Sequence, residues 1–197
     1  SHEENLNEAR KLQTPRMVSV VSLLLTNARD EKLKSELNQI ESEKFADMVI
    51  TDMNGLRFAG VEQDVIEKTS IFAMDSVSQI FYLEGIKDPY SGSVLHKLNL
   101  SIIYKSKAKR NYISANLCDK WGRCEDNLLN INVISSIATN CDKSTCKYNE
   151  VIELVLDNEL LEKSKYSGLT IRYNFKNKSN KVKVSSAYLM GYLKVVK

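Results

Sequence analysis

The sequence contains little histidine, glycine, proline or tryptophan, and these shortages exclude several classes of site. Its 197 residues include two histidines, seven glycines, two prolines and one tryptophan. Glycine-rich loops that hold phosphates and the fingerprints of dinucleotide-binding proteins are absent. Catalysis by a serine or cysteine nucleophile needs a histidine or an equivalent base. Since Ser1 and His2 resemble the remnant of a tag, only His96 is left, and we expect it to be an ordinary histidine of a strand.

The paired carboxylates of the sequence do not indicate an enzyme either. Glu150 and Glu153 lie three residues apart in a predicted strand, where alternation puts them on opposite faces. Asp157 and Glu159 stand at the predicted start of a helix, where acidic side chains stabilise the amide dipoles. The sequence therefore predicts no catalytic residue, no metal ligand and no cofactor. We expect a protein that is not an enzyme.

The sequence also lacks a strong charge and a long apolar run. Its 28 Lys and Arg residues against 25 Asp and Glu give a formal net charge of +3. A nucleic-acid partner would call for a concentrated basic face, so we predict none. No run reaches the roughly 20 apolar residues of a membrane-spanning helix, and we predict no transmembrane segment in this chain. No signal peptide is recognisable, so if the protein is exported we expect its leader to have been removed.

The four cysteines form two close pairs that flank residues 128–139. This run contains no glycine or proline, and its first half alternates apolar and polar residues as a half-buried strand does. When extended it spans roughly 40 Å, whereas bridged Cα atoms lie within about 7 Å of each other. We therefore predict the local disulfides Cys118–Cys124 and Cys141–Cys146, one at each end of the strand. A zinc site and four reduced cysteines are the alternatives.

Disulfides would place the protein in an oxidising compartment. We therefore expect an exported protein. Trp121 lies inside the first predicted ring. We expect its indole to pack over the disulfide, and an exposed aromatic side chain used in recognition is the alternative.

The predicted fold class is α+β: a mainly antiparallel β-sheet or sandwich with N-terminal helices and a short C-terminal helix. Residues 1–45 are predicted to form a helical segment, with a charged helix at 3–12 and a second helix that starts at Thr14 and Pro15. We expect these helices to pack on the sheet. A stalk or a partner-binding hairpin is the alternative, and the β-branched residues 18–21 also suit a strand.

Residues 46–197 are predicted to form an antiparallel β-rich domain of about eight strands that holds both disulfides. Asn54 and Gly55 lie between two extended runs and indicate a hairpin. Residues 95–104 and 111–117 are predicted to pair as a second hairpin. The other predicted strands are 71–74, 77–84, 128–139, 151–156, 169–175 and 182–184. Helices are predicted from the cap at Asp157 and Asn158 to Tyr166, with Gly168 after it, and at 187–196 after Ser185 and Ser186.

Several short motifs occur together in the C-terminal half. They are Cys146-Lys-Tyr148-Asn-Glu150, Leu160-Leu161, Gly168-Leu169-Thr-Ile171 and Ala187-Tyr188-Leu189-Met190-Gly191-Tyr192-Leu193. In these motifs the chain resembles a group of uncharacterised exported proteins of Gram-negative bacteria, many of which look like lipoproteins. The resemblance implies an envelope location, periplasmic or associated with the outer membrane, and a mainly β domain. It supplies no catalytic residues.

Two predicted turns are rich in basic residues. The members of this candidate anion-binding patch are Lys105, Lys107, Lys109 and Arg110 in one turn and Lys176, Lys178, Lys181 and Lys183 in the other. If both turns meet at one end of the domain, they can attract the phosphates of lipid head groups or lipopolysaccharide. Ordinary solvated loops are the alternative.

These features predict a non-enzymatic protein of the cell envelope, a periplasmic or lipoprotein module that binds a partner or has a structural role. Its candidate partners are another envelope protein or an anionic lipid surface. A secreted factor that binds a host or competitor surface is a second hypothesis. An unrecognised hydrolase is a third, which would need a pocket where His96 or paired acids converge.

Overall fold

The computed structural model describes residues 15–68, 76–119 and 121–197. The chain divides into two units, Ser1–Ile40 and Glu41–Lys197. The strand predicted at 71–74 and the helix predicted at 3–12 lie outside the described residues. No helix within the described ranges has the length and apolar character that crossing a membrane requires.

The first unit contains most of helix α2, which spans Pro15–Asp47. Proline suits the first position of a helix because its missing N–H would have no partner there. The 32 residues that follow contain neither glycine nor proline, so the helix continues without a break, through the β-branched residues 18–21. Within this unit the side chains of Leu33, Leu37 and Ile40 are exposed.

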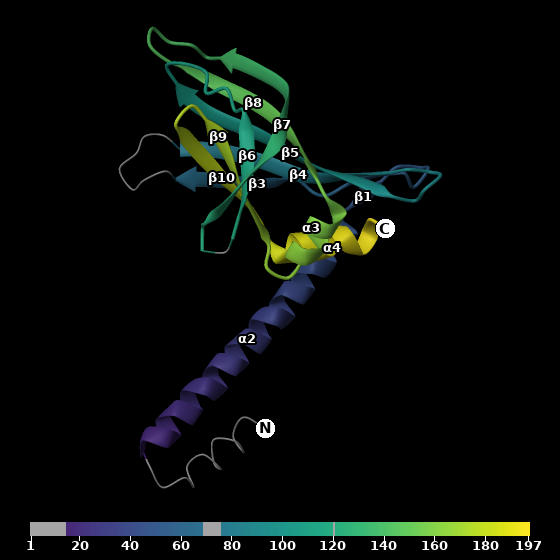
Figure 1. Cartoon of the computed structure of the whole chain (residues 1–197), viewed down its shortest axis with the longest axis vertical. Helices are drawn as coiled ribbons and strands as arrows, with labels where there is room; N and C mark the ends of the chain where they lie inside the picture. The colour runs from purple at the N-terminus through teal and green to yellow at the C-terminus, as the bar shows by residue number, and fades with distance from the viewer. Residues whose placement is uncertain (1–14, 69–75, 120) are drawn as a thin grey trace. The chain divides into compact units, whose positions relative to one another are not determined.

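The second unit is built on one antiparallel sheet of ten strands, which curls on itself (Figure 1). The strands are β1 (Ile50–Thr51), β2 (Arg57–Ala59), β3 (Gln63–Lys68), β4 (Ser76–Lys87), β5 (Val94–Ser106), β6 (Ser114–Cys118), β7 (Cys124–Thr139), β8 (Cys146–Leu156), β9 (Leu169–Phe175) and β10 (Lys178–Val184). Their order is β1-β2-β4-β5-β8-β7-β6-β9-β10, and β3 also pairs with β4. The mainly antiparallel β fold is confirmed, with a single curled sheet in place of the two packed sheets of a sandwich.

The pairing predicted between residues 95–104 and 111–117 is wrong. Strand β5 pairs with β4 and β8, whereas β6 pairs with β7 and β9. The reason is that β7 and β8 form a long hairpin whose second strand occupies the edge of β5. Strand β6 is joined to β7 through the short Cys118–Cys124 turn, so it lies on the far side of β7. By contrast, the hairpin predicted at Asn54 and Gly55 is confirmed as β1–β2.

Both predicted disulfides are present, and they lie at opposite ends of β7. Cys118 bonds to Cys124 where β6 turns into β7, and Cys141 bonds to Cys146 where β7 turns into β8. The first half of β7 puts Leu129 and Ile131 against the core, as its alternation predicts. A β-bulge between Val133 and Ser135 then interrupts the register.

The core fills the inside of the curled sheet. It is lined by alternate residues of β4, β5, β8, β9 and β10, among them the fully buried Leu98, Leu100 and Ile152. The two ends of the sheet approach each other, since β10 lies close to β3 and the buried Gln79 of β4 donates from Nε2 to the carbonyl of Lys181, at 3.0 Å.

Two short helices cover one end of the sheet (Figure 1). Helix α3 (Asn158–Ser164) is capped by Asp157, and helix α4 (Ser186–Val195) is capped by Ser185, as the sequence predicts. The Tyr188 hydroxyl of α4 donates to the Val61 carbonyl at 2.9 Å and accepts from the Leu83 amide at 3.2 Å. These bonds fix α4 against the sheet.

Removing either disulfide should lower stability without changing the fold. On the chain-entropy account, each short ring contributes about 2 kcal/mol by restricting the unfolded chain. The double variants Cys118→Ser/Cys124→Ser and Cys141→Ser/Cys146→Ser should each lose about that much free energy of unfolding in urea. The parent protein should lose both contributions on addition of a reductant. Equal midpoints with and without reductant would show that the bridges do not stabilise the protein.

Candidate anion-binding site

The two lysine-rich turns meet in one cleft of about 680 Å³, which we call the basic cleft. Its basic lining residues are Lys105, Lys107, Lys109, Arg110, Lys176 and Lys178. Its other lining residues are Ser106, Ala108, Thr145, Phe175 and Asn177. None of the described residues that line the cleft is acidic. Lys181 and Lys183, which the sequence places in the same patch, lie further along β10 and do not line the cleft.

The sheet register explains why these distant turns are neighbours. Strand β6 pairs with β9, and the pairing continues beyond the strand, where the Ile113 amide donates to the Asn174 carbonyl at 3.0 Å. This draws the end of the β5–β6 connection alongside the β9–β10 turn. In that turn Phe175 pairs with Lys178, so only Lys176 and Asn177 lie between the two strands.

Lys176 has an uncommon backbone conformation at the tip of this turn. Its φ is +50°, in the left-handed region that glycine and asparagine adopt more readily than lysine. Such residues cost free energy and tend to occur at functional sites. The turn therefore keeps a lysine where glycine would be easier to accommodate.

Arg110 lies in the cleft in a fixed orientation. Its Nη1 donates to Asn180 Oδ1 at 3.0 Å and to the Tyr112 hydroxyl at 3.3 Å. The guanidinium carbon lies 4.2 Å from the centre of the Tyr104 ring and 4.9 Å from that of Phe175. Cation–π contacts of this kind stabilise a guanidinium that is partly removed from water. Arg110 is half-buried, so its position is set by contacts rather than by solvent.

A buried carboxylate lies beneath Arg110. The Tyr104 hydroxyl donates to Glu150 Oε1 and accepts from the Arg110 backbone amide at 2.8 Å. Glu150 is fully buried, and its Oε2 has no hydrogen-bond partner within the part of the chain that the structure describes. Burial, together with the hydrogen bond to Glu150, raises the pKa of Tyr104. The phenol therefore stays protonated and continues to donate.

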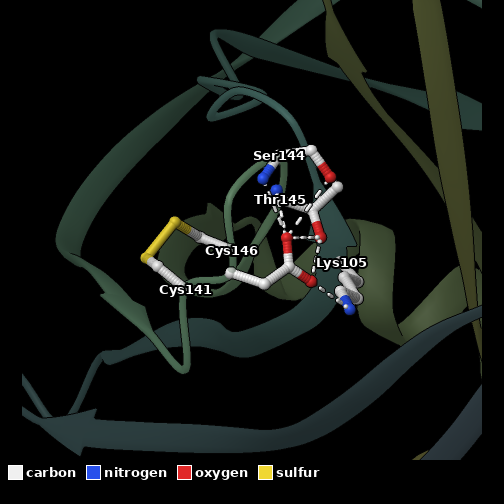
Figure 2. A network of polar contacts seen from close by, with 6 residues as sticks. Lys105, Cys141, Ser144, Thr145 and Cys146 are labelled. Atoms are coloured by element: carbon white, nitrogen blue, oxygen red, sulfur yellow. Dashed lines mark hydrogen bonds and ion pairs between the residues drawn. A yellow bond between two sulfur atoms is a disulfide. The ribbon is translucent and has the colours of Figure 1, made fainter.

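The wall of the cleft next to β8 is held by the turn that the second disulfide closes (Figure 2). Asp142 Oδ1 accepts from the amides of Ser144 and Thr145 at 2.9 and 2.8 Å. Its Oδ2 accepts from Lys105 Nζ at 2.9 Å. These bonds, first that from the Ser144 amide and then that from Lys105, lower the pKa of Asp142. The carboxylate therefore stays charged and keeps Lys105 and Thr145 at the edge of the cleft.

The remaining four lysines of the cleft carry no such partner. Lys107, Lys109, Lys176 and Lys178 make no ion pair with any acid among residues 15–68, 76–119 and 121–197. Two of them line the cleft from each of its two turns. The arrangement therefore concentrates unneutralised positive charge around a hollow large enough for a head group.

The other residues that the sequence singled out lie away from this cleft. His96 is buried beside helix α3, where its Nδ1 and Nε2 lie 3.0 and 3.1 Å from the Tyr192 hydroxyl and Asn158 Oδ1. Glu153 points to the outer face of the sheet, opposite to Glu150, and pairs with Lys97 at 3.1 Å. Trp121 is 73% exposed. Contrary to our expectation, its indole therefore does not pack closely over the Cys118–Cys124 disulfide.

A second hollow, of about 1130 Å³, lies at the opposite end of the sheet. It is lined mainly by aliphatic side chains, among them Leu117, Leu129, Leu160 and Val196. Asp157, which caps α3, and Asn158 and Glu162, which lie within α3, also line it. Within the ranges described, no three or more His, Cys, Asp or Glu side chains are grouped so that they could hold a metal ion.

Searches with family models, against curated proteins and against solved structures find no match to this chain.

Sequence reasoning found the cations of the cleft but missed the residues that position them. These residues are Tyr104, Tyr112, Asp142, Thr145, Glu150, Phe175 and Asn180. One signal was available: Tyr104 and Phe175 each end an alternation of apolar and polar residues, in phase with its apolar positions. Nothing in the sequence indicates that both alternations end beside Arg110, because that depends on the strand order.

The Tyr104 hydroxyl should contribute measurably to stability. Tyr104→Phe leaves Glu150 Oε1 and the Arg110 amide without their shared partner in a buried place, which costs about 1–3 kcal/mol. Tyr148→Phe is the matched control, because the Tyr148 ring stacks on Tyr104 at 5.4 Å and its hydroxyl bonds to no residue that the structure describes. Urea unfolding should show the loss in the first variant and less than about 0.5 kcal/mol in the second. Equal effects would contradict the network.

Proposed function

We propose that this protein is a non-enzymatic binding module of the bacterial cell envelope and that it uses the basic cleft to hold an anionic surface. The observation that carries the proposal is that two lysine-rich turns, distant in sequence, line one hollow to which no acid contributes among the residues that the structure describes. Four of these lysines have no acidic partner among the described residues. Surface lysines scattered without function would not be expected to gather in this way.

The compartment rests on the disulfides. Two bridges and no free cysteine point to an oxidising, exported location, because cytosolic thiols are kept reduced. A periplasmic or outer-membrane-associated position is the finer part of the proposal. The resemblance of the C-terminal half to exported, lipoprotein-like proteins supports it, as does a cleft suited to the anionic surfaces of an envelope.

The same residues favour binding over catalysis. The described residues that line the cleft are lysines, an arginine and a few residues with hydroxyl or amide groups, and none of them has a carboxylate or imidazole that could act as a base. His96 is buried at the other end of the sheet, with both ring nitrogens in hydrogen-bond contact. The geometry therefore supports attraction and retention of an anion without a chemical step.

Binding to vesicles should depend on the four unpaired lysines. Each lysine near an anionic surface contributes about 1 kcal/mol. The variant Lys107→Glu/Lys109→Glu/Lys176→Glu/Lys178→Glu should therefore bind vesicles of phosphatidylcholine and phosphatidylglycerol more than about a hundredfold more weakly, measured by co-sedimentation. Binding by the parent protein should weaken as salt is added.

A matched variant separates the cleft from overall charge. Lys34→Glu/Lys87→Glu/Lys183→Glu/Lys197→Glu changes the net charge by the same amount outside the cleft. It should keep most of the vesicle binding. An equal loss in both variants would show that net charge, and not the cleft, is responsible. Binding of the parent protein to phosphatidylcholine vesicles alone would also contradict the proposal.

A further inference from the structure

Arg110 differs from the lysines of the basic cleft because it is held in place before any ligand arrives. The rings of Tyr104 and Phe175 lie against its guanidinium at 4.2 and 4.9 Å. Its Nη1 is committed to Asn180 and Tyr112. Asn180 is itself buried and also accepts from the Tyr112 hydroxyl at 2.9 Å. The side chain of Asn180 is therefore held in place, and it holds Arg110 in turn. The lysines of the rim have no comparable support.

Part of the Arg110 guanidinium has no hydrogen-bond partner among the described residues. Nε and Nη2 of Arg110 donate to no residue that the structure describes, while Arg110 lines the cleft. A guanidinium presents its N–H groups as a planar fork that matches two oxygens of one phosphate. Because the side chain is already ordered, a ligand would bind without the entropy cost of fixing it.

The charge around Arg110 indicates how many negative charges the ligand carries. Lys107 and Lys109 lie on the same side of the cleft as Arg110, and Lys176 and Lys178 lie on the other side. A phosphate monoester carries three terminal oxygens and a charge of about −1.5 to −2 near neutral pH. Two of its oxygens can meet the fork while the third meets an ammonium group. A phosphate diester has only two terminal oxygens and a single charge.

The size of the cleft indicates that the phosphate belongs to a larger group. A hollow of about 680 Å³ is well within the range of sites for small organic ligands and far exceeds a single phosphate. Thr145 and Asn177 add neutral polar groups to its lining. Hydroxyl groups of a sugar or glycerol are suitable partners for such side chains.

We propose that the basic cleft recognises a phosphate monoester on a polar head group, with Arg110 as the residue that orients the phosphate. This inference rests on the proposed function and adds the chemical class of the ligand. The fixed fork of Arg110 holds two oxygens of the phosphate, so that the third oxygen, which a diester lacks, meets an ammonium group of the four lysines. Either a lipid head group or a soluble phosphorylated sugar could supply the chemistry.

The test compares two anionic lipids that differ in this chemistry. Vesicles containing phosphatidic acid present a monoester, and vesicles containing phosphatidylglycerol present a diester; the two should be matched in surface charge. The parent protein should bind phosphatidic acid about tenfold or more tightly, and this preference should grow from pH 5.5 to pH 7.5, because the second pKa of a phosphate monoester is about 6.

Two substitutions assign the preference to a residue. Arg110→Lys keeps the charge but removes the fork that orients the phosphate, so it should bind the two lipids with nearly equal affinity, in both cases more weakly than the parent protein binds phosphatidic acid. Arg123→Lys makes the same change at the exposed turn of the other disulfide and should keep the preference. Glucose 1-phosphate separates the sources: competition with vesicles at comparable affinity indicates a soluble ligand, and its failure to compete indicates a lipid, both consistent with a monoester site.

The inference and the proposed function fail in different ways. Equal binding of the parent protein to the two lipids, still lost in the four-lysine variant, would overturn the monoester site and leave the basic cleft as a general anion site. This comparison needs no Arg110 variant and so does not depend on how that variant folds. Binding to neither lipid nor to glucose 1-phosphate would overturn both.

Discussion

The backbone pairing of β8 with β5 on one side and β7 on the other is the constraint on which the rest of the second unit depends. With β8 in that place, β6 cannot pair with β5 and instead lies between β7 and β9. The curl of the sheet then brings β10 close to β3, with one core inside. The two disulfides stabilise the turns at either end of β7, and the turn with Cys141 and Cys146 forms part of the basic cleft.

Gathering six cations around one hollow raises the energy of the protein without a ligand, because like charges repel and no acid lines the hollow in the part of the chain that is described. The structure offsets part of this cost. Asp142 neutralises Lys105, and two aromatic rings and Asn180 hold Arg110. The other four lysines of the cleft form no ion pair with an acid among the described residues. An anion in the cleft would relieve the remaining repulsion, and this gives the cleft its proposed role.

Local features of the fold could be predicted, and features that depend on strand order could not. The inability of residues 128–139 to fold back was enough to pair the cysteines, and Asp157 and Ser185 marked the starts of α3 and α4. The alternation of apolar and polar residues along a strand, however, is the same in a sandwich and in a curled sheet. It does not indicate which strand pairs with which. The pairing expected between β5 and β6 failed for this reason. Likewise the lysines were visible in the sequence, but the contacts of Arg110 with Tyr104 and Phe175 were not.

Cross-linking with a short amine-reactive reagent, followed by peptide mass spectrometry, tests the central claim most directly. If the strand order is as described, Lys107 or Lys109 should link to Lys176 or Lys178, because both turns border the same cleft. Neither turn should link to Lys87 or Lys163, which lie toward the opposite end of the sheet. Links from Lys176 or Lys178 to those distant lysines, with none to Lys107 or Lys109, would contradict the account.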